Sequence, residues 1–566
     1  MLKQFQQDKV WKVSKKVYDD IIHQLLYNRG VIGLAPDTEV IKSFLSPDFI
    51  SGTHDPFLLI GLKEATERIK QAIYKNETVG IFGDYDADGV PASALLHRTF
   101  KALGLKSIVY IPTRDQGYGL SKSGIDYLIK QGCGLVITVD LGIRSLAEAE
   151  YCKEKRIDLI ITDHHLPGEL LPNATIVINP KQASDKYPNK ELSGAGVAFK
   201  LMQGLGVLYP KKVTEQFLKW NLDLVAISTI SDVVKLVGEN RVFAKFGLVV
   251  LNKTRNIGLA SLIKRSGIKT PITGYSVGFQ IAPRINAPGR IDHATKSFEL
   301  LVTDDPIESE TLSDELNERN EARQHLMDKA EKEIINQIIS LGPTEDRLIV
   351  VAGKWERGIV GPTASRLVDH FSRPVIVFSE DGEELVGSAR SVEGVNIITL
   401  FESAVSCIKK FGGHAGAAGL TVEKKLFPKF VQAMKIISDE QIPLKSLRKV
   451  LKIDAEVSLR ELTVELSDEL SKFEPYGIGN SRPKFLVRNV NLSSPRFVGR
   501  EKNHLSAMIG DGDCSTKMIF FNSNLDPSLL SDDVKIDLVC SLGADEWNGK
   551  RKACLTIEDI RMSDET

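Results

Sequence analysis

Three aspartates at alternate positions in the segment GDYDADG, residues 83–89, have a spacing that suits metal chemistry. In an extended segment Asp84, Asp86 and Asp88 point the same way, and their carboxylates repel one another. Divalent metal ions can offset that repulsion. Two such ions about 4 Å apart can neutralise a group of carboxylates, hold a phosphate and activate a water molecule. The segment therefore predicts a metal centre.

Two further segments carry metal-binding side chains at corresponding positions. Asp140 follows the apolar run LVITV, and Asp163, His164 and His165 follow the run LIIT. Because ligands bind outside the carboxyl ends of strands in open α/β sheets, we expect these side chains to lie near the first segment. Carboxylate and imidazole ligands favour manganese or magnesium over a sulfur-rich zinc site. Asp140 is the candidate for a carboxylate that bridges two ions.

Each segment alone has a simpler interpretation. An aspartate at the end of a strand commonly forms a turn or caps a helix. Asp163 could cap the next segment in this way, with His164 and His165 at the surface. If every one of these aspartates only formed a turn or capped a helix, acidic or imidazole side chains would have to follow three parallel strands by chance. We therefore favour the metal centre.

The elements that would position these side chains form a regular alternation of apolar runs and helical segments. Strands are expected at residues 78–82, 107–111, 135–139, 157–162 and 175–178. This rhythm predicts a parallel sheet covered by helices. Residues 306–342 carry apolar residues at helical spacing and predict one long helix joining two domains, with a peripheral helix of one large domain as the alternative. A second α/β pattern begins at residue 347, and short strands after about residue 450 predict a small barrel.

The composition is that of a globular protein, with 42% hydrophobic and 26% charged residues among 566. A net charge of −1 neither indicates nor excludes nucleic acid, because a local basic channel can lie beside an acidic centre. The six cysteines are scattered without a CxxC pair, which argues against a zinc site and a disulfide framework. Without a signal peptide or an apolar run of membrane-spanning length, we expect a cytoplasmic protein that does not contact a membrane.

The segments GDYDADG, TVDLG, TDHHLPG and ISDVV occur in this order, and together they resemble the four motifs of the DHH phosphoesterase superfamily. LSGAGVAFKL and RINAPGR make the match closer. FGGHAGAAG at 411–419 resembles the signature of the DHH-associated domain, and FEPYGIGNSRP at 473–483 resembles the oligonucleotide-binding (OB) barrel of the same family. The resemblance covers essentially the whole chain and is closest to bacterial exonucleases that degrade single-stranded DNA from the 5′ end.

This resemblance implies an α/β fold in which a parallel-sheet DHH domain and a second α/β domain are joined by a long helix and followed by an OB-like β-barrel. The expected divisions are an N-terminal segment packing on the catalytic domain (1–50), the DHH catalytic domain (51–305), the connecting helix (306–342), a DHH-associated nucleic-acid-binding domain (343–446) and an OB-like single-strand-binding domain (447–566).

The resemblance also implies two divalent metal ions, manganese or magnesium. The metal ligands implied by the motifs are Asp86, Asp88, Asp140, His164 and Asp232 of ISDVV. Three further residues are expected to be catalytic: Asp84 as a ligand or a neighbour of one, and Asp163 and His165 as residues that orient ligands or contact the scissile phosphate. Two departures stand out, because Pro91 replaces a small hydroxyl residue and Leu141 a small or polar one. Neither removes a ligand.

Nucleic-acid contacts are implied for Arg114, Arg290, Ser388, Arg390, Gly413 and His414. An arginine can fork onto phosphate oxygens and a serine hydroxyl can add a hydrogen bond, while glycine lets a backbone approach closely. A surface salt bridge is the alternative for each arginine. Residues 481–504 are also basic and include Phe485, for which a place in the barrel core is the preferred interpretation.

The function implied is a metal-dependent exonuclease that releases mononucleotides from the 5′ end of single-stranded DNA in repair and recombination. A single-strand-binding protein and a helicase are partners expected by analogy, and a monomer is expected. A non-catalytic DNA-binding scaffold on the same fold and a DHH phosphodiesterase of short oligonucleotides are the alternatives. The intact acidic motifs argue against the scaffold, and the barrel argues against a very small substrate.

Overall fold

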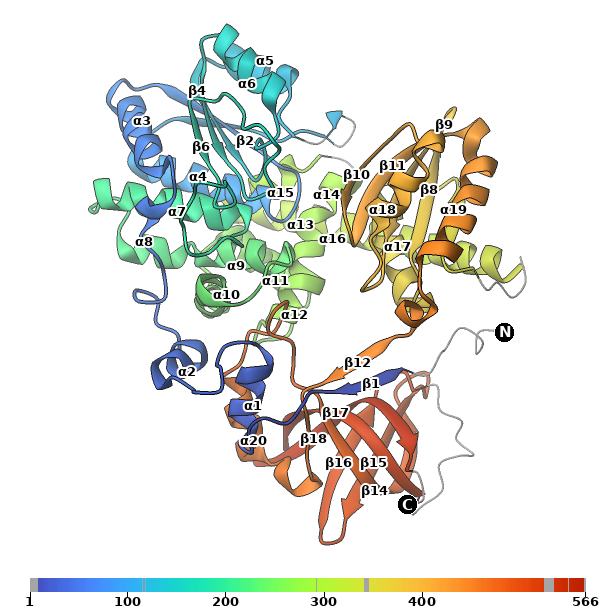
Figure 1. Ribbon diagram of the computed structural model, residues 1–566. Coiled ribbons are helices and arrows are strands. Elements are labelled where there is room, and N and C mark those ends of the chain that lie inside the picture. The colour runs from blue at the N-terminus through green and yellow to red at the C-terminus, as the bar shows by residue number, and fades with distance from the viewer. Residues whose placement is uncertain are drawn as a thin grey trace.

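The computed structural model describes residues 9–113, 116–117, 119–291, 293–340, 346–523, 534–547 and 549–563. Two α/β domains lie side by side at one end of the molecule, and a β-barrel lies at the other end (Figure 1). This is the fold class that the sequence predicts. Within the described residues, no helix has both the length and the apolar character needed to cross a membrane.

The first domain is built on a five-stranded parallel sheet in the order β3-β2-β4-β5-β6. Its strands are β2 (Thr78–Gly83), β3 (Ser107–Tyr110), β4 (Cys133–Val139), β5 (Asp158–Thr162) and β6 (Ile176–Ile178). All five expected strands are present. Strand β3 lies on one side of β2, and the next strand, β4, lies on the other side. The direction in which strands are added to the sheet therefore reverses between β2 and β4. Ligand sites in such sheets lie at this reversal, outside the carboxyl ends of the strands.

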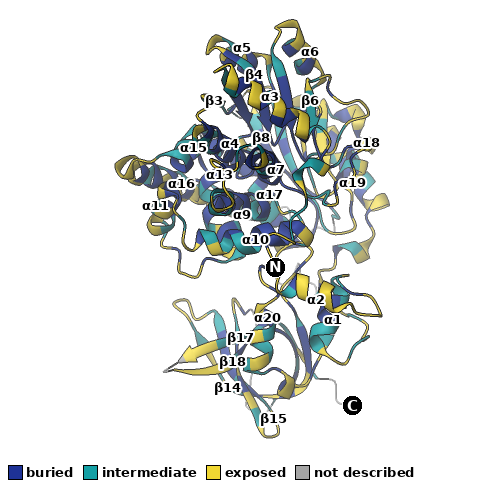
Figure 2. Cartoon of the chain, turned by 90° about the vertical axis from the view of Figure 1, so that its left-hand side faces the viewer, coloured by how far each residue is buried: buried dark blue, intermediate teal, exposed yellow. Residues whose placement is uncertain are grey.

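Alternate residues of the sheet face two separate cores, as the pleat of a strand requires. One face packs on α3 (Leu62–Tyr74), α4 (Gly89–Leu103) and α7 (Gly194–Leu208). The other face packs on α5 (Lys122–Lys130) and α6 (Leu146–Glu154). Behind the first face lie α9 (Leu222–Ser231) and α10 (Gly238–Leu251). Helices α4, α7 and α9 are buried over most of their length inside the domain (Figure 2).

The long helix α16 (Pro306–Ser340) joins the two α/β domains. Leu312 and Leu316 near its start belong to the core of the first domain. Ile334 and Ile338 near its end belong to a core of the second domain, together with α17 (Arg357–Phe371). One helix therefore contributes to both cores, which is the expected arrangement and not that of a peripheral helix.

The second domain contains a mixed sheet in the order β10-β11-β9-β8-β7. Its strands are β7 (Ile349–Gly353), β8 (Val375–Asp381), β9 (Glu384–Arg390), β10 (Lys410–His414) and β11 (Ala417–Glu423). Only the β7–β8 pair among these described strands is parallel. Helix α17 covers one face of the sheet, and α18 (Ile397–Ser403) with α19 (Phe427–Gln441) covers the other.

The C-terminal strands are β13 (Ala455–Glu456), β14 (Phe485–Val498), β15 (His504–Asp511), β16 (Cys514–Phe520), β17 (Val534–Trp547) and β18 (Lys550–Met562). Pairing of β14 with β17 closes the sheet into a barrel. Phe485 is fully buried in the barrel core, as its alternating strand pattern indicates.

The N-terminal segment is expected to pack on the catalytic domain, but the structure gives it a different main partner. Strand β1 (Val10–Val13) pairs in parallel with β12 (Val450–Ile453), between the second domain and the barrel (Figure 1). Leu25 and Leu26 of α1 (Ile21–Asn28) and Phe44 of α2 (Thr38–Leu45) belong to the barrel core. The expected contact with the first domain is also present: Phe49 belongs to that domain's core, Nε of Arg241 donates to the carbonyl of Phe44, and Nζ of Lys245 donates to the carbonyl of Leu45. The helical pattern of residues 1–50 requires an apolar partner but does not specify which core supplies it.

Candidate metal centre and nucleic-acid contacts

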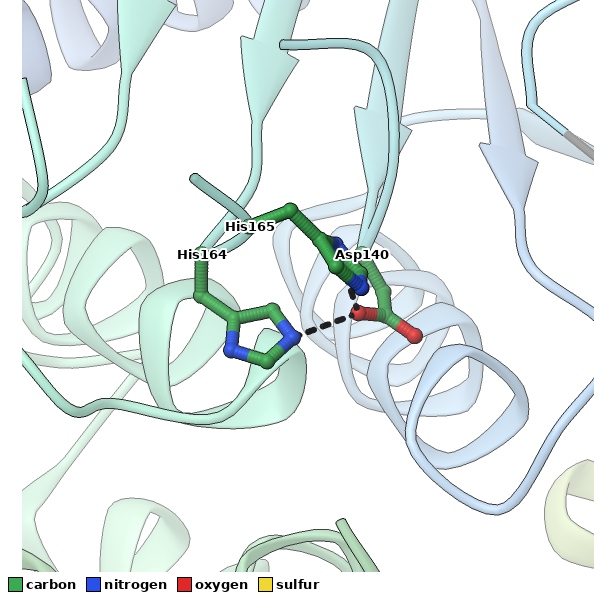
Figure 3. Close-up of side chains that lie close together, drawn as sticks. All are labelled: Asp140, His164 and His165. Atoms are coloured by element: carbon green, nitrogen blue, oxygen red, sulfur yellow. Dashed lines mark ion pairs between the residues drawn. The ribbon is translucent and has the colours of Figure 1, made fainter. Parts of the chain in front are cut away.

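The three predicted segments meet at the carboxyl edge of the parallel sheet. β2 leads into Asp84, β4 into Asp140 and β5 into Asp163. The aligned pairs Gly83–Val139 and Val139–Thr162 show that the three strands end at the same level. The side chains of Asp140, His164 and His165 converge at this edge (Figure 3).

Asp140 occupies a tight turn that directs its carboxylate into the centre of the cluster. Its φ of +64° lies in the left-handed region, which non-glycine residues rarely adopt outside turns and functional sites. The turn is held by hydrogen bonds from the amide of Asp140 to the carbonyl of Thr162 (3.1 Å) and from Oγ1 of Thr138 to the carbonyl of Leu141 (2.8 Å). The sequence TVDLG therefore forms a turn that holds the carboxylate of Asp140 in one orientation.

Seven of the eight predicted catalytic and ligand residues fall into three groups in which the potential ligand atoms lie within 4.8 Å of one another. The groups are Asp140 with His164 and His165, Asp88 with His164 and Asp232, and Asp84 with Asp86 and Asp140. Asp140 and His164 each belong to two groups. The geometry therefore suits Asp140 as the carboxylate shared between two ions.

The imidazole of His164 lies at the centre of the acids. Its Nε2 is 3.0 Å from Oδ1 of Asp140, 3.5 Å from Oδ2 of Asp88 and 3.7 Å from Oδ2 of Asp232. Both ring nitrogens of His164 and Oδ1 of Asp140 are buried, yet none of these atoms makes a hydrogen bond within the described part of the chain. Buried polar atoms without partners are costly. The donor set fits a divalent cation such as manganese or magnesium, which would supply these partners.

The clustered charges shift the pKa values of the acids. Burial, followed by repulsion from Asp88 and Asp86, raises the pKa of Asp232 to about 8. Burial and the neighbouring carboxylates also raise the pKa of Asp140 well above its usual range. Each shift has the sign expected of carboxylates that lack a counter-charge. A divalent ion would reverse it, so proton and metal compete for the same oxygens.

Asp163 is the predicted site residue that lies outside the three groups. Its Oδ1 accepts hydrogen bonds from the amides of His164 (2.7 Å) and His165 (3.1 Å) and from Nδ1 of His165 (2.8 Å). Its Oδ2 accepts from the amide of Ile143 (2.9 Å). Burial disfavours the ionised form, but the contacts with His165 and His164 and the hydrogen bond from Ile143 together outweigh it and lower the pKa of Asp163. Likewise, burial alone would lower the pKa of His165, but the contact with Asp163 and the charges of Asp232 and Asp88 together raise it to about 9. This geometry favours the orienting role expected for Asp163.

Asp88 is held by the start of helix α7. Its Oδ2 accepts a hydrogen bond from the amide of Gly194 (2.7 Å), and its Oδ1 accepts from the amide of Ala195 (2.8 Å) and from Oγ of Ser228 (2.5 Å). A Cβ atom at Gly194 would lie only 2.5 Å from Cβ of Asp140. Gly194 and Ser228 therefore shape the centre, although sequence reasoning did not single them out. The signal was present in LSGAGVAF, where a serine caps a helix whose first residue is glycine.

Ser388 and Arg390, two of the expected nucleic-acid residues of the second domain, lie beside the start of α17. Nη1 of Arg390 donates to Oγ of Ser388 at 2.9 Å. A Cβ at Gly361 of α17 would lie 3.1 Å from both of these side chains. Nη1 of Arg290 donates to the carbonyl of Gly358, one turn earlier in α17, at 3.3 Å. A helix N-terminus between arginine and serine side chains is a favourable environment for a phosphate.

A short helical segment connects this region to the metal centre. Arg290 belongs to α14 (Pro288–Ile291), and its neighbour Gly289 approaches the carbonyl of Tyr85 so closely that a Cβ would lie 2.7 Å away. Just before α14, Oδ1 of Asn286 accepts a hydrogen bond from the amide of Ala87 (2.7 Å). The segment GDYDADG and Arg290 are thus brought together across the domain junction.

Gly413 and His414 lie on the edge strand β10 and are exposed. Gly413 has a φ of +146°, and a Cβ there would lie 2.4 Å from the carbonyl oxygen of Ala417, so the position requires glycine. His414 aligns with Ala417 of β11, which aligns with Arg390 of β9. These residues therefore lie at the same end of the sheet. Arg114 lies outside the described residues.

The two departures from the family pattern lie beside the centre and supply no ligand atom to the three groups. Pro91 is the third residue of α4 and is buried, a position in the first helical turn that proline tolerates. Leu141 is buried in the core beneath α5 and α6.

Comparison with known proteins agrees with this arrangement. Residues 78–229 match the DHH family N-terminal domain, residues 345–437 the DHHA1 domain and residues 453–559 the RecJ OB domain. The chain is 36% identical to the single-stranded-DNA-specific exonuclease RecJ of Bacillus subtilis over 99% of this chain and 70% of the relative. It is 32% identical to the protein of the same name from Escherichia coli, over 89% of this chain and 90% of the relative.

Solved structures give the same result. The crystal structure of RecJ from Thermus thermophilus in complex with Mn²⁺ matches 98% of this chain and 80% of that chain, with a TM-score of 0.82 and 27% identity. The corresponding Mg²⁺ complex matches 98% and 79%, with a TM-score of 0.77 and 26% identity. The sequence motifs, the metal-binding geometry and these matches agree, and the chain belongs to the RecJ family of single-stranded-DNA-specific exonucleases.

Proposed function

We propose that this protein is a metal-dependent exonuclease that hydrolyses single-stranded DNA from the 5′ end and releases mononucleotides, in DNA repair and recombination. The observation that carries the proposal is the buried, hydrogen-bond-deficient cluster around His164 and Asp140, next to the arginine and serine side chains at the start of α17. The relatives named single-stranded-DNA-specific exonuclease RecJ support this substrate.

The centre would bind two divalent ions, manganese or magnesium. Asp86, Asp88, Asp140, His164 and Asp232 are the proposed ligands, and Asp84 is a ligand or contacts one. Bound there, the ions would polarise a phosphate oxygen and activate the attacking water. Asp163 holds the backbone and ring of His165 in place, and the partly exposed ring of His165 lies beside Asp140, where it would contact the scissile phosphate.

The direction of digestion follows from which end of the strand is held. Arg290, Ser388 and Arg390 are proposed to bind the 5′-phosphate, with Arg114 and the β10 residues Gly413 and His414 as further contacts. Water attacks the next phosphorus, and the bond from that phosphorus to the 3′ oxygen of the terminal nucleotide breaks. The shortened strand then carries a new 5′-phosphate, which presents the same group to the same residues for the next cycle.

An end-labelled digestion tests this function. Single-stranded, duplex and 5′-blocked oligonucleotides would be incubated with manganese, with magnesium and with a chelator. We expect mononucleotides from the 5′ end of single strands in either metal, and none in chelator or from the Asp140→Ala protein. Asp19→Ala is the matched control, since the side chain of Asp19 is 99% exposed. DNA binding without cleavage in any metal would favour a scaffold, and cleavage confined to di- or trinucleotides would favour a small-substrate phosphodiesterase.

The cellular setting and further partners remain predictions. All six cysteines are free, and five of them are buried, which supports a reducing cytoplasm. A single-strand-binding protein and a helicase are the expected protein partners, and the chain is expected to act as a monomer.

A further inference from the structure

A large groove separates the first domain from the chain that leads into the barrel. Its volume is about 1050 Å³, and its lining is more apolar than polar. The first domain contributes the end of α9, part of α10, α12 (Gly274–Ser276) and the π-helical turn Val277–Ile281. The other wall is the segment 474–482, which passes next to α12 (Figure 1). The amide of Leu236 donates to the carbonyl of Ile478 at 2.8 Å and ties the two walls together.

Two aromatic rings stand open to solvent in this groove. Tyr275 is 66% exposed and Phe279 is 68% exposed. Their ring centroids are 4.8 Å apart and the ring planes differ by 28°, so the rings are stacked on each other. Scattered exposed apolar residues are ordinary, but contiguous apolar surface commonly marks a binding site. Val233 and Ile478, both more than half exposed, extend the same surface.

The local backbone fixes the two rings in place. A capping box between Thr273 and Ser276 begins the helical segment that carries Tyr275. The π-helical turn that follows carries Phe279 one turn later, on the same side as Tyr275. Single π-helical turns occur frequently at functional sites. The pair is therefore held by ordered backbone.

The groove passes beside the chain that carries a proposed metal ligand. Ser231 and Val233 line it, and Asp232 lies between them in the sequence without lining the groove itself. Val233 has a φ of +60°, which is a true outlier for a β-branched residue, and its side chain is exposed in the groove. The facing wall includes Tyr476 and Arg482, with the guanidinium of Arg482 5.6 Å from the ring centre of Tyr476. Strand β14 of the barrel begins three residues after Arg482.

These positions identify the occupant. The residues proposed to hold the 5′ end belong to α14, α17 and β9, and none of these elements lines the groove. The strand on the 3′ side of the scissile bond must leave the metal centre elsewhere, and the groove extends from Ser231 and Val233, the neighbours of Asp232, to the segment that enters the barrel. Its apolar floor suits bases more than phosphates, and unpaired bases stack well on aromatic rings. In a duplex the base faces are covered by neighbouring base pairs.

We propose that Tyr275 and Phe279 form a base-stacking platform for single-stranded DNA on the 3′ side of the scissile bond. This inference rests on the proposed function and deepens it, because stacking on unpaired bases discriminates single strands from duplex. Arg482 with Tyr476 continues the path toward the barrel.

The test combines loss of the rings with loss of the bases. The Tyr275→Ala/Phe279→Ala protein and the wild type would digest 3′-labelled oligonucleotides in manganese, with normal nucleotides or with an abasic run a few positions from the 5′ end. Stacking on an aromatic ring contributes about 1–3 kcal/mol per base, so we expect a rise in KM of about fivefold or more for the double variant on normal DNA. The abasic run should raise the KM of the wild type similarly and leave that of the variant unchanged.

Controls separate this role from a structural one. Tyr74→Ala removes an aromatic side chain that is 90% exposed on α3, outside the groove, and should leave KM unaltered. The conservative Tyr275→Phe/Phe279→Trp protein should retain the wild-type KM. The kcat at saturating DNA and the manganese-dependent rise in melting temperature should be unchanged in every groove variant.

Two results would overturn the proposal. One is an unchanged KM in the double variant, which would leave the groove for another ligand such as a protein segment. The other is a further rise in the KM of the double variant when the DNA carries the abasic run, so that the two increases in KM multiply. That result would mean that the rings do not contact the bases. The same comparison can be made without cleavage, by introducing Asp140→Ala into each protein and measuring its affinity for normal and abasic DNA by fluorescence anisotropy. A failure of the proposed nuclease activity therefore remains distinguishable from a failure of base stacking.

Discussion

Replacing Gly194 by alanine should disable the metal centre while leaving the fold intact. The new Cβ would lie 2.5 Å from Cβ of Asp140, 2.7 Å from its Cγ and 2.8 Å from its Oδ1. Carbon atoms prefer about 3.5–4.0 Å, so about 1 Å of overlap must be relieved. Helix α7 is buried in the core and cannot slide freely. Either Asp140 moves, or the start of α7 retreats and weakens its 2.7 Å and 2.8 Å hydrogen bonds to Asp88.

A displacement of this size is small for the fold but large for a catalytic centre. Overpacking of a buried site costs about 1–3 kcal/mol of folding free energy, whereas a misplacement of about 1 Å at a reacting centre can cost about a hundredfold in rate. We expect Gly194→Ala to bind Mn²⁺ at least tenfold more weakly and to lose about a hundredfold in kcat.

Calorimetric titration with Mn²⁺ and the end-labelled digestion measure these two quantities, and circular dichroism reports the fold. Gly196→Ala is the matched control in the same helical turn. The three atoms nearest to its Cβ would belong to the side chains of Ser193 and Leu192, at 3.3–3.5 Å, and none would belong to Asp140. If Gly194→Ala kept the metal affinity and kcat of the wild type, the new Cβ would not crowd Asp140 and the reasoning would be refuted. An equal loss of affinity and kcat in Gly196→Ala would refute it as well.

Three further predictions follow from buried charges. The carboxyl pKa of Asp232 is about 8 and that of Asp140 is also raised, so in the metal-free protein their contribution to stability is complete below the unfolded pKa of about 3.9 and is lost as pH rises toward 8. The increase in melting temperature caused by Mn²⁺ should therefore grow from pH 6 to pH 8, and a flat profile in thermal unfolding would contradict this. Arg241→Met removes a buried guanidinium that donates to four carbonyls at the junction with the barrel. We expect the free energy of unfolding in urea to fall by about 3 kcal/mol or more, and proteolysis at residues 472–474 to be faster. An unchanged urea midpoint would show that these hydrogen bonds do not stabilise the junction. Glu239→Gln leaves the ammonium of Lys200 buried without its counter-charge and should cost about 3–5 kcal/mol in the same assay. The Lys200→Met/Glu239→Gln double variant should recover most of that loss, and equal instability of both proteins would exclude the charge as the cause.

Much of the first domain could be predicted from local pattern. Continuous apolar runs such as TVGIF and LVITV allow a buried parallel strand and little else, and they locate Asp84 and Asp140 at strand ends. Parallel pairing then brings residues far apart in sequence to one edge. The convergence of Asp140 and His164 was predictable because it depends on strand order and strand length, which are regular.

Other parts of the site could not be predicted, because they depend on how surfaces meet. The approach of Gly194 to Asp140 depends on the depth at which α7 packs, and no periodicity encodes that depth. The stacked pair Tyr275 and Phe279 reads in sequence as ordinary core residues at helical spacing, and only the packed structure shows that both rings are exposed. Phe44 likewise has the spacing of a buried helical residue, but the sequence does not indicate that its core is the barrel.

The pairing of β1 with β12 has a consequence for biosynthesis. Val10 aligns with Val450, and Trp11 is held against the last barrel strand by a 2.7 Å hydrogen bond to Asp559. A ribosome makes residues 10–26 before β12 and the barrel strands, so β1 and the apolar residues Leu25 and Leu26 are synthesised long before their partners exist. Contacts between residues so far apart in the sequence form slowly. Until the barrel is made, the apolar side chains of the N-terminal segment stay exposed, and such surface is prone to aggregate. The barrel is thus completed by segments that lie far apart in the sequence, so it cannot finish folding until β18 has been made.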